Sequence, residues 1–278
     1  MPSANGGARA QVDRMRPSNR GRAGRALRLL ATDPGKVFRR LARLFRPMPQ
    51  PYRDRFSMTL REWLVHHQTR VVFDHCHWMG VPSLKNPLDA WVYQEMLFEL
   101  KPERLLEIGS AAGGSTLFFA HLMDLIGTGQ VVSVDIDRSG FLARHPRITE
   151  VTGDSASAEV ISRVHDLCRG HATMLVHDGD HSKGAVLRDL EAYQDLIPPG
   201  GAIVVEDGVQ DLFRPGDGLG TFEEGPLAAV DEFLRRHPDF SVDATRERYI
   251  ATYNPRGFLK RAGASASAAR QRLDSTSS

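Results

Sequence analysis

The chain has 278 residues, 41% of them hydrophobic, and this length predicts one large domain with a sizeable core and appendages. Cys76 and Cys168 lie far apart without Cys/His ligand spacing, which argues against a disulfide framework or a zinc site. No apolar run reaches the length of a membrane span and the N-terminus lacks a secretory signal, so we expect a cytoplasmic protein.

Basic residues concentrate at the N-terminus, although the net charge is only +2. Residues 1–50 hold 12 Lys/Arg against two Asp, which leaves 24 basic and 32 acidic residues for 51–278. Residues 1–24 are polar, Gly-rich and free of aromatics, so we expect a largely disordered extension. The expected extension spans residues 1–50, and the pattern of residues 36–46 within it predicts a short basic amphipathic helix. We consider three roles for this helix: packing on the domain, peripheral contact with a membrane surface, or nucleic-acid binding. We expect no nucleic-acid partner and build no function on the helix.

The predicted elements of the remaining chain alternate between strands and helices. The sequence of residues 51–103 predicts a helical segment that includes a helix over 87–103. Residues 262–278 are of low complexity, so we expect them to form a disordered tail. Between them, short apolar runs bounded by turns predict strands buried on both faces, at 104–109, 130–137, 148–154, 172–180 and 201–208. Helical patterns separate them at 115–127, 158–168 and 183–197. The alternation predicts an α/β fold with a mostly parallel sheet and helices on both faces, in which ligands bind at the carboxyl ends of the strands.

The first strand end predicts a cofactor-binding turn. Glu107 closes the strand, Gly109 and Gly113 permit a tight turn, and the next helix begins near Ser115. Backbone N–H groups around Ser110 then face a nucleotide-like ligand. The spacing is ExGxxxG and differs from the GxGxxG of dinucleotide folds. A turn whose glycines serve only packing is the alternative.

Carboxylates follow the next two strands. Asp135 ends the second strand 28 residues after Glu107, where such folds place an acid that accepts hydrogen bonds from ribose hydroxyls. Asp137 shares its strand face, but only one of the two needs to contact ribose. The third strand ends in Asp154 and Ser155, which lie at the same sheet edge and form either part of the cofactor site or a plain turn.

Three further carboxylates are predicted to converge on a metal ion. Asp178 follows the fourth strand within the sequence HDGDH, and Glu206 and Asp207 follow the fifth. Carboxylates at neighbouring strand ends repel one another, and a divalent cation relieves this repulsion. An all-oxygen set favours Mg²⁺, Mn²⁺ or Ca²⁺ over zinc. Asp178 is also expected to be one of the residues that bind the cofactor. Acidic residues at strand ends that are merely solvated are the alternative.

A general base is predicted beside this cluster. His181 stands three positions after Asp178, near the start of a helix, and is placed to reach a group bound to the metal. Asp180 is the second candidate for this role. His177 is predicted to point to the opposite face of the strand and to serve packing.

The ordered set of motifs resembles a known family. LLEIGSAAGGSTLFFA, VVSVDID, HDGDHS, VVEDG and YNPRGFLKR together look like class I S-adenosylmethionine-dependent, metal-dependent O-methyltransferases of the cephalosporin hydroxylase and rhamnosyl O-methyltransferase group, over about residues 70–261. The resemblance implies a Rossmann-like core over 104–261 with S-adenosylmethionine beside Glu107, Gly109 and Asp135. It also implies Mg²⁺, or another hard divalent cation, on the three carboxylates, and it places His181 at the base position. A homo-oligomer formed through residues 51–100 is favoured on the same ground.

Two motifs depart from the family pattern. His177 and Gly179 replace an aliphatic residue and a serine, and the loop after Asp207 reads LFRPGDGLGTFEEGP in place of a Gly/Pro-rich segment, with Phe222 and Glu223 added. Changes in this loop affect the expected acceptor more than the chemistry.

The expected activity is Mg²⁺-dependent methylation of a hydroxyl on a sugar of a glycolipid, polysaccharide or glycosylated natural product. A catechol would meet the same chemical requirement. The alternatives are a hydroxylase-associated role and a non-catalytic metal- or nucleotide-binding partner in a biosynthetic complex. Retained cofactor binding without methyl transfer would favour the latter. A nicotinamide enzyme is disfavoured by the ExGxxxG spacing.

Overall fold

The computed structural model describes residues 56–213, 217 and 224–263. The chain divides into two units, Met1–Pro51 and Tyr52–Ser278, and every described residue belongs to the second. The basic helix expected at 36–46 therefore lies outside the described residues, as does the tail beyond residue 263. None of the helices within the described ranges has the length and apolar character that crossing a bilayer requires.

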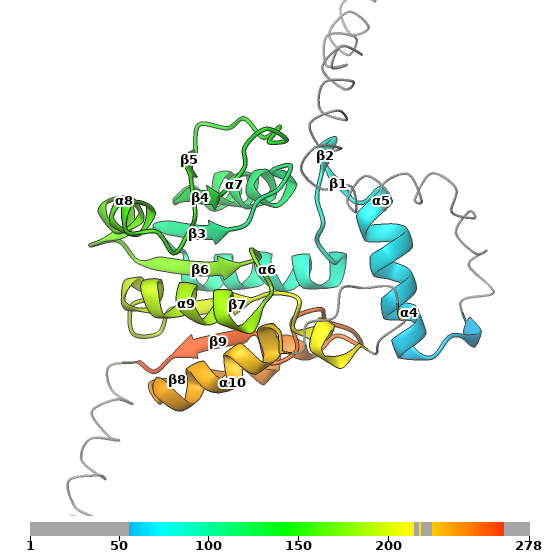
Figure 1. Ribbon diagram of the computed structural model, residues 1–278. Helices are drawn as coiled ribbons and strands as arrows, with labels where there is room; N and C mark the ends of the chain where they lie inside the picture. The colour runs from blue at the N-terminus through cyan, green and yellow to red at the C-terminus, as the bar shows by residue number, and fades with distance from the viewer. Residues whose placement is uncertain (1–55, 214–216, 218–223, 264–278) are drawn as a thin grey trace, which may run out of the picture. The chain divides into compact units, whose positions relative to one another are not determined.

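A seven-stranded sheet forms the centre of the described unit, in the order β5-β4-β3-β6-β7-β9-β8 (Figure 1). Strands β3 to β7 pair in parallel, and β9 runs antiparallel to both of its neighbours. The strands are β3 Arg104–Ile108, β4 Gln130–Asp135, β5 Ile148–Thr152, β6 Thr173–His177, β7 Ala202–Val205, β8 Phe240–Val242 and β9 Phe258–Arg261. The prediction of a mostly parallel sheet is confirmed, and the antiparallel edge adds strands that the sequence analysis did not predict.

Helices cover both faces of this sheet. Helices α6 and α7 pack on one face, and α8, α9 and α10 pack on the other. They span α6 Pro87–Leu100, α7 Gly114–Ile126, α8 Ala158–Cys168, α9 Lys183–Tyr193 and α10 Pro226–Arg236. The helix expected over 87–103 ends at Leu100, because Lys101 takes a left-handed conformation at its C-cap. The helix expected over 183–197 ends at Tyr193 and continues as the short 3-10 helix η4, Gln194–Leu196.

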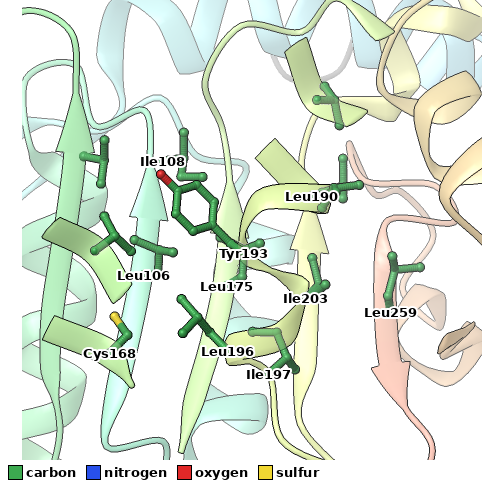
Figure 2. Packing of buried hydrophobic residues seen from close by; sticks show 14 of the residues in the cluster. Leu106, Ile108, Cys168, Leu175, Leu190, Tyr193, Leu196, Ile197, Ile203 and Leu259 are labelled. Carbon is green, nitrogen blue, oxygen red and sulfur yellow. The ribbon is translucent and has the colours of Figure 1, made fainter. Parts of the chain in front are cut away.

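Alternating side chains of each strand serve the two faces. Leu105 packs with the α6/α7 layer, whereas Leu106 packs with the α8–α10 layer. In Figure 2, Leu106, Leu175 and Ile203 of three neighbouring strands lie beneath Tyr193. Each such side chain contributes roughly 1.5–3 kcal/mol by leaving water, so the sheet is a rigid support for the residues at its edge.

The segment before α6 packs beside the carboxyl ends of the strands. It comprises α4 Leu60–His66, the π-helical stretch η3 His67–Val72, α5 Phe73–His75 and a small hairpin of β1 His77–Trp78 and β2 Val81–Pro82. A capping box between Thr59 and Glu62 starts α4. Leu64 and Val72 pack against Val209 and Phe213, in and beside the 3-10 helix η5 Gly208–Leu212. This segment therefore borders the turn that follows β7.

The strand order reverses between β3 and β6. The chain runs from β3 outward to β4 and β5, and then returns to place β6 on the other side of β3. Ligands of open α/β sheets bind in the crevice at such a switch point, outside the carboxyl ends of the strands. The predicted site residues follow β3, β4, β5, β6 and β7, and all belong to this edge.

Candidate active site

A cavity of about 590 Å³ lies over the carboxyl ends of these strands. Ten of the predicted site residues line it: Gly109, Ser110, Ser115, Asp135, Asp154, Ser155, Asp178, Asp180, His181 and Asp207. Glu107, Gly113 and Glu206 do not. The sequence motifs thus mark one cavity, and the three exceptions are buried residues outside its lining.

The turn between β3 and α7 forms the floor of the cavity. Gly109 has a φ of +83°, and a Cβ added there would lie 2.0 Å from the carbonyl oxygen of Asp178. Only glycine permits this approach of the turn to the end of β6. Glu107 is fully buried below the turn, where it accepts hydrogen bonds from Ser115 Oγ at 2.5 Å and from Thr116 Oγ1. Glu107 therefore holds the start of α7 in place.

Asp135 at the end of β4 is a preformed acceptor at one end of the cavity. Its Oδ2 accepts hydrogen bonds from the backbone N–H groups of Ser110 and Ala111 at 2.8 and 2.9 Å. Burial works against its ionisation, but backbone hydrogen bonds, first that from Asp137, outweigh burial and lower the pKa of Asp135. Asp137 itself is exposed and accepts hydrogen bonds from Ser139.

Asp154 and Ser155 lie on the same side of the cavity, in the loop after β5. Asp154 is exposed and Oδ1 accepts a hydrogen bond from the Ala156 N–H at 3.0 Å. Ser155 donates to the buried Asp189 at 3.0 Å. Two carboxylates and several backbone N–H groups therefore flank this end, which suits the hydroxyls and amino group of a nucleoside.

Acidic side chains converge at the other end. Asp178, His181 and Asp207 each offer a metal-ligating atom, and these atoms lie within 4.8 Å of one another. Asp178 follows β6, its N–H donates to the Ile108 carbonyl at 2.7 Å, and Asp207 follows the neighbouring β7. The parallel pairing of β6 and β7 thus brings residues 29 positions apart to one point. Burial raises the pKa of Asp207, as expected for clustered acids.

Glu206 pairs through one oxygen with a buried lysine. Lys85 Nζ lies 2.5 Å from Glu206 Oε1 and 2.6 Å from Asp178 Oδ2, and Tyr93 donates its hydroxyl hydrogen to the same Glu206 oxygen at 2.6 Å. Burial and the charge of Asp178 raise the pKa of Glu206 to about 8. Burial works against the charge of Lys85, but Asp178 and Glu206 raise its pKa well above the usual value. Two of the three predicted metal ligands therefore pair with one internal cation.

His181 has hydrogen-bonding partners on both ring nitrogens. Its Nε2 lies 3.3 Å from Asp178 Oδ1 and its Nδ1 lies 2.9 Å from Gln210 Nε2. Burial works against protonation, but the hydrogen bond with Asp178 and the charge of Asp207 raise the pKa of His181 to about 9. Asp180, the other candidate base, is exposed and accepts a hydrogen bond from the Ser182 N–H. The geometry therefore brings His181, and not Asp180, to the acidic cluster.

The position of Asp207 depends on the last part of the chain. Its φ is +59°, a conformation that aspartate tolerates and most residues avoid. The Asp207 N–H donates to Asn254 Oδ1 at 3.0 Å, and the Val209 N–H donates to the Tyr253 carbonyl. Asn254 belongs to the YNPRG motif and is 1% exposed. This motif supports the turn after β7.

Sequence and structure comparisons place the chain among known proteins. The profile of the family described as rhamnosyl O-methyltransferase/CmcI matches residues 70–262. A rhamnosyl O-methyltransferase of Mycobacterium leprae is 37% identical over 198 residues, 68% of this chain and 85% of the relative. One of Mycobacterium bovis is 32% identical over 200 residues, 69% and 80% of the two chains.

The chain belongs to the rhamnosyl O-methyltransferase/CmcI family. The resemblance read from the motifs is confirmed, and the protein is an S-adenosylmethionine-dependent O-methyltransferase. A CmcI structure described as a Mg-SAM complex superposes with a TM-score of 0.56 at 24% identity, covering 79% of this chain and 88% of that one. At this identity the superposition supports the class I methyltransferase fold.

The methyltransferase differs from the expected family pattern at His177, which is fully buried. Its Nε2 lies 2.9 Å from Asp189 Oδ2, the oxygen that also accepts from Ser155. His177 thus points away from the acidic cluster, as its strand position predicts, and supports the loop beside Asp154. Phe222 and Glu223 of the altered loop lie outside the described residues.

Four residues that hold the site were missed by the sequence analysis: Lys85, Tyr93, Gln210 and Asn254. Lys85 lies 93 and 121 positions before Asp178 and Glu206, and Tyr93 lies 113 positions before Glu206, so no local spacing connects them. Gln210 stands three positions after Asp207 in a 3-10 helix, where its amide bonds both Asp207 and His181. Asn254 could have been found from the sequence, because it belongs to the YNPRG motif. The motif alone did not indicate which turn it supports.

Proposed function

We propose that this methyltransferase transfers the methyl group of S-adenosylmethionine to a hydroxyl of a sugar and requires Mg²⁺ or a similar divalent cation. The observation that carries the proposal is the convergence of Asp178, His181 and Asp207 at one end of the cavity whose other end holds Asp135 and Asp154. A cofactor that spans the cavity would bring its methyl group toward the acidic end.

The cofactor is assigned to the end with preformed acceptors. Asp135 would accept hydrogen bonds from the ribose hydroxyls, because its carboxylate is already ionised and fixed by the turn after β3. Asp154 and Ser155 would contact the base, and Gly109 and Ser110 would line the middle of the ligand. Glu107 acts from below by holding Ser115 and Thr116.

The acidic end suits a hard divalent cation. Asp178 and Asp207 supply carboxylate oxygens, and we assign Glu206 as the third ligand through Oε2, for which no described residue provides a hydrogen bond. When bound, such a cation lowers the pKa of a coordinated hydroxyl and offsets the negative charge that favours protonated His181. The CmcI structure described as a Mg-SAM complex has the same fold.

The acceptor is assigned to the space beside His181. Gln68, Phe73 and Gln210 line this part of the cavity, and Gln68 is 5% exposed with an Oε1 that has no partner among the described residues. A buried amide without a partner is costly, so it favours a polar acceptor with several hydroxyls. The relatives from Mycobacterium are named rhamnosyl O-methyltransferases, which makes a rhamnosyl group the first candidate.

The residues of this chain then have distinct parts in the reaction. Methyl transfer is an in-line displacement at the sulfonium methyl, so the acceptor oxygen must be held at near-attack distance. Asp178 and Gln210 hold the ring of His181 in place: the Asp178 carboxylate accepts the Nε2–H of the neutral ring, so the lone pair on Nδ1 accepts the proton of the acceptor hydroxyl. Proton removal by a positioned base contributes a factor of about 10²–10⁴.

The test is transfer of a radiolabelled methyl group to simple glycosides. Purified protein would be incubated with labelled S-adenosylmethionine and either methyl α-L-rhamnoside, other methyl glycosides or catechol, with Mg²⁺ or with EDTA. We expect label on a glycoside that EDTA abolishes and added Mg²⁺ restores. Label on catechol alone would contradict the sugar assignment, and transfer that resists EDTA would contradict the metal assignment.

A further inference from the structure

Lys85 is a charged residue of the active site that no sequence motif marks. It is 5% exposed and lies in the loop between β2 and α6. Its ammonium group contacts Asp178 after β6 and Glu206 after β7. One cation from the N-terminal part of the chain therefore joins the ends of two neighbouring strands.

The loop that carries Lys85 is firmly held. The Ser83 N–H donates to the Cys76 carbonyl at 3.0 Å, and Cys76 Sγ donates to the Lys85 carbonyl at 3.3 Å. Asn86 caps α6 through its side chain. A Cβ added at Gly114 would lie 2.2 Å from the Pro82 carbonyl oxygen, so the loop also packs closely on the start of α7. These contacts fix the backbone on both sides of Lys85.

Lys85 contacts only one oxygen of each acid. Its ammonium group donates a hydrogen bond to Asp178 Oδ2, whereas Asp178 Oδ1 lies 3.3 Å from His181 Nε2. Lys85 takes Oε1 of Glu206 together with Tyr93, and no described residue donates a hydrogen bond to Oε2. A carboxylate fixed through one oxygen presents the other in a defined direction, which is how outer-shell partners orient metal ligands.

From this geometry we propose that Lys85 is a positioning residue for the divalent cation: its ammonium clamps Asp178 and Glu206 so that Oδ1 and Oε2 face the ion. The inference rests on the proposed metal requirement and extends it. Lys85 also offsets the repulsion among Asp178, Glu206 and Asp207, which allows their carboxyl groups to lie close together. A competing view treats the ammonium as a rival of the cation for the same oxygens, and the two views predict opposite changes in metal affinity.

The experiment measures metal binding alone, without acceptor or turnover. Mn²⁺ would be titrated into the full chain, and free Mn²⁺ would be followed by electron paramagnetic resonance. Lys85→Met removes the ammonium and keeps most of the side-chain volume. We expect its Kd for Mn²⁺ to rise by about 10- to 100-fold, as is typical when an outer-shell partner is lost. Lys260→Met is the matched control, because Lys260 is exposed and pairs with Ala202 at the opposite end of β7. It should leave the Kd unchanged.

A second variant covers the case in which Lys85→Met fails to fold, as judged by circular dichroism. Tyr93→Phe removes the other donor to Glu206 Oε1 without altering charge, and we expect a Kd about 5-fold higher. An unchanged or lower Kd in the folded variant would overturn the clamp while leaving the metal assignment intact. Failure of the unaltered protein to bind Mn²⁺ would overturn both the clamp and the metal requirement.

Discussion

The two ends of the cavity hold their carboxylates in opposite ways. Asp135 receives backbone N–H groups from the turn after β3, and these lower its pKa. Glu206 lies among other acids and is satisfied by two side chains, Lys85 and Tyr93, and its pKa rises to about 8. Backbone donors cost no side-chain entropy and need no partner ion. The end with Asp135, to which we assign the nucleoside and which we call the nucleoside end, is therefore complete by itself, whereas the acidic end needs positive charge.

Because the two ends hold their carboxylates differently, we expect a substitution at one end to leave the function of the other end intact. A change at the acidic end should affect the metal and the chemical step, and a change at the nucleoside end should affect cofactor affinity. The four variants below are ordered by the size of the expected effect.

Asp207→Asn should have the largest effect, because it removes a charged ligand of the proposed cation and leaves the backbone unstrained. Asparagine also tolerates the φ of +59° found at this position. We expect turnover to fall by roughly 10³-fold, or about 4 kcal/mol, with little change in S-adenosylhomocysteine affinity. Initial rates and calorimetric titration of the same preparation would check both parts. Equal losses of turnover and of cofactor affinity would remove the distinction between the ends.

His181→Gln should lower turnover by about 10²-fold, the lower end of the range for a general base. Glutamine keeps hydrogen-bonding capacity beside Asp178 and Gln210 but does not accept a proton at neutral pH. Binding of Mn²⁺ should be altered far less than in Asp207→Asn. Normal turnover in this variant would shift the base assignment to Asp180.

Asp135→Asn tests the nucleoside end and should weaken S-adenosylhomocysteine binding by about 10- to 100-fold, equivalent to losing a hydrogen bond to a charged group. The turnover rate at saturating cofactor should change little, because the acidic end is intact. Calorimetric titration measures the affinity, and Mn²⁺ binding in the same variant is the control. Unaltered affinity would show that the ribose lies elsewhere.

Asn254→Ala should have the smallest effect. It removes the acceptor of the Asp207 N–H and leaves a buried donor unpaired, which costs about 1–3 kcal/mol. Thermal unfolding should show a lower Tm, and Mn²⁺ affinity should fall while cofactor affinity is retained. A lower Tm with unchanged Mn²⁺ affinity would limit Asn254 to a structural role.

The sheet and the predicted site residues at its edge were predictable because the patterns that mark them are local in the sequence. Runs such as QVVSVD and TMLVH mark strands buried on both faces, and the alternation with helices fixes them as parallel. Once the strands are parallel, the residues that follow them must share an edge, so Asp135, Asp178 and Asp207 could be assigned to one cavity. The edge strands β8 and β9 were missed because they are short and pair in antiparallel fashion.

The residues that support the site were not predictable, because they lie far from their partners in the sequence. Lys85 and Tyr93 reach Glu206 only because α6 packs beside β6 and β7, and their sequence separation carries no local signal. The pairing of Glu206 with both residues follows from these tertiary contacts. Glu107 was assigned to the cofactor from its motif, yet its carboxylate is occupied by Ser115 and Thr116. Motifs thus identified the edge, and packing decided which side chains face the cavity.

The most direct test of the two-ended site is a crystal structure of the protein grown with S-adenosylhomocysteine and Mn²⁺, with data collected at the manganese absorption edge. We expect ribose hydroxyls against Asp135 and a single anomalous peak bonded to Asp178 Oδ1, Glu206 Oε2 and an Asp207 oxygen. Lys85 should still contact Asp178 Oδ2. S-adenosylhomocysteine in this place without any anomalous peak among Asp178, Glu206 and Asp207 would contradict the metal-dependent mechanism.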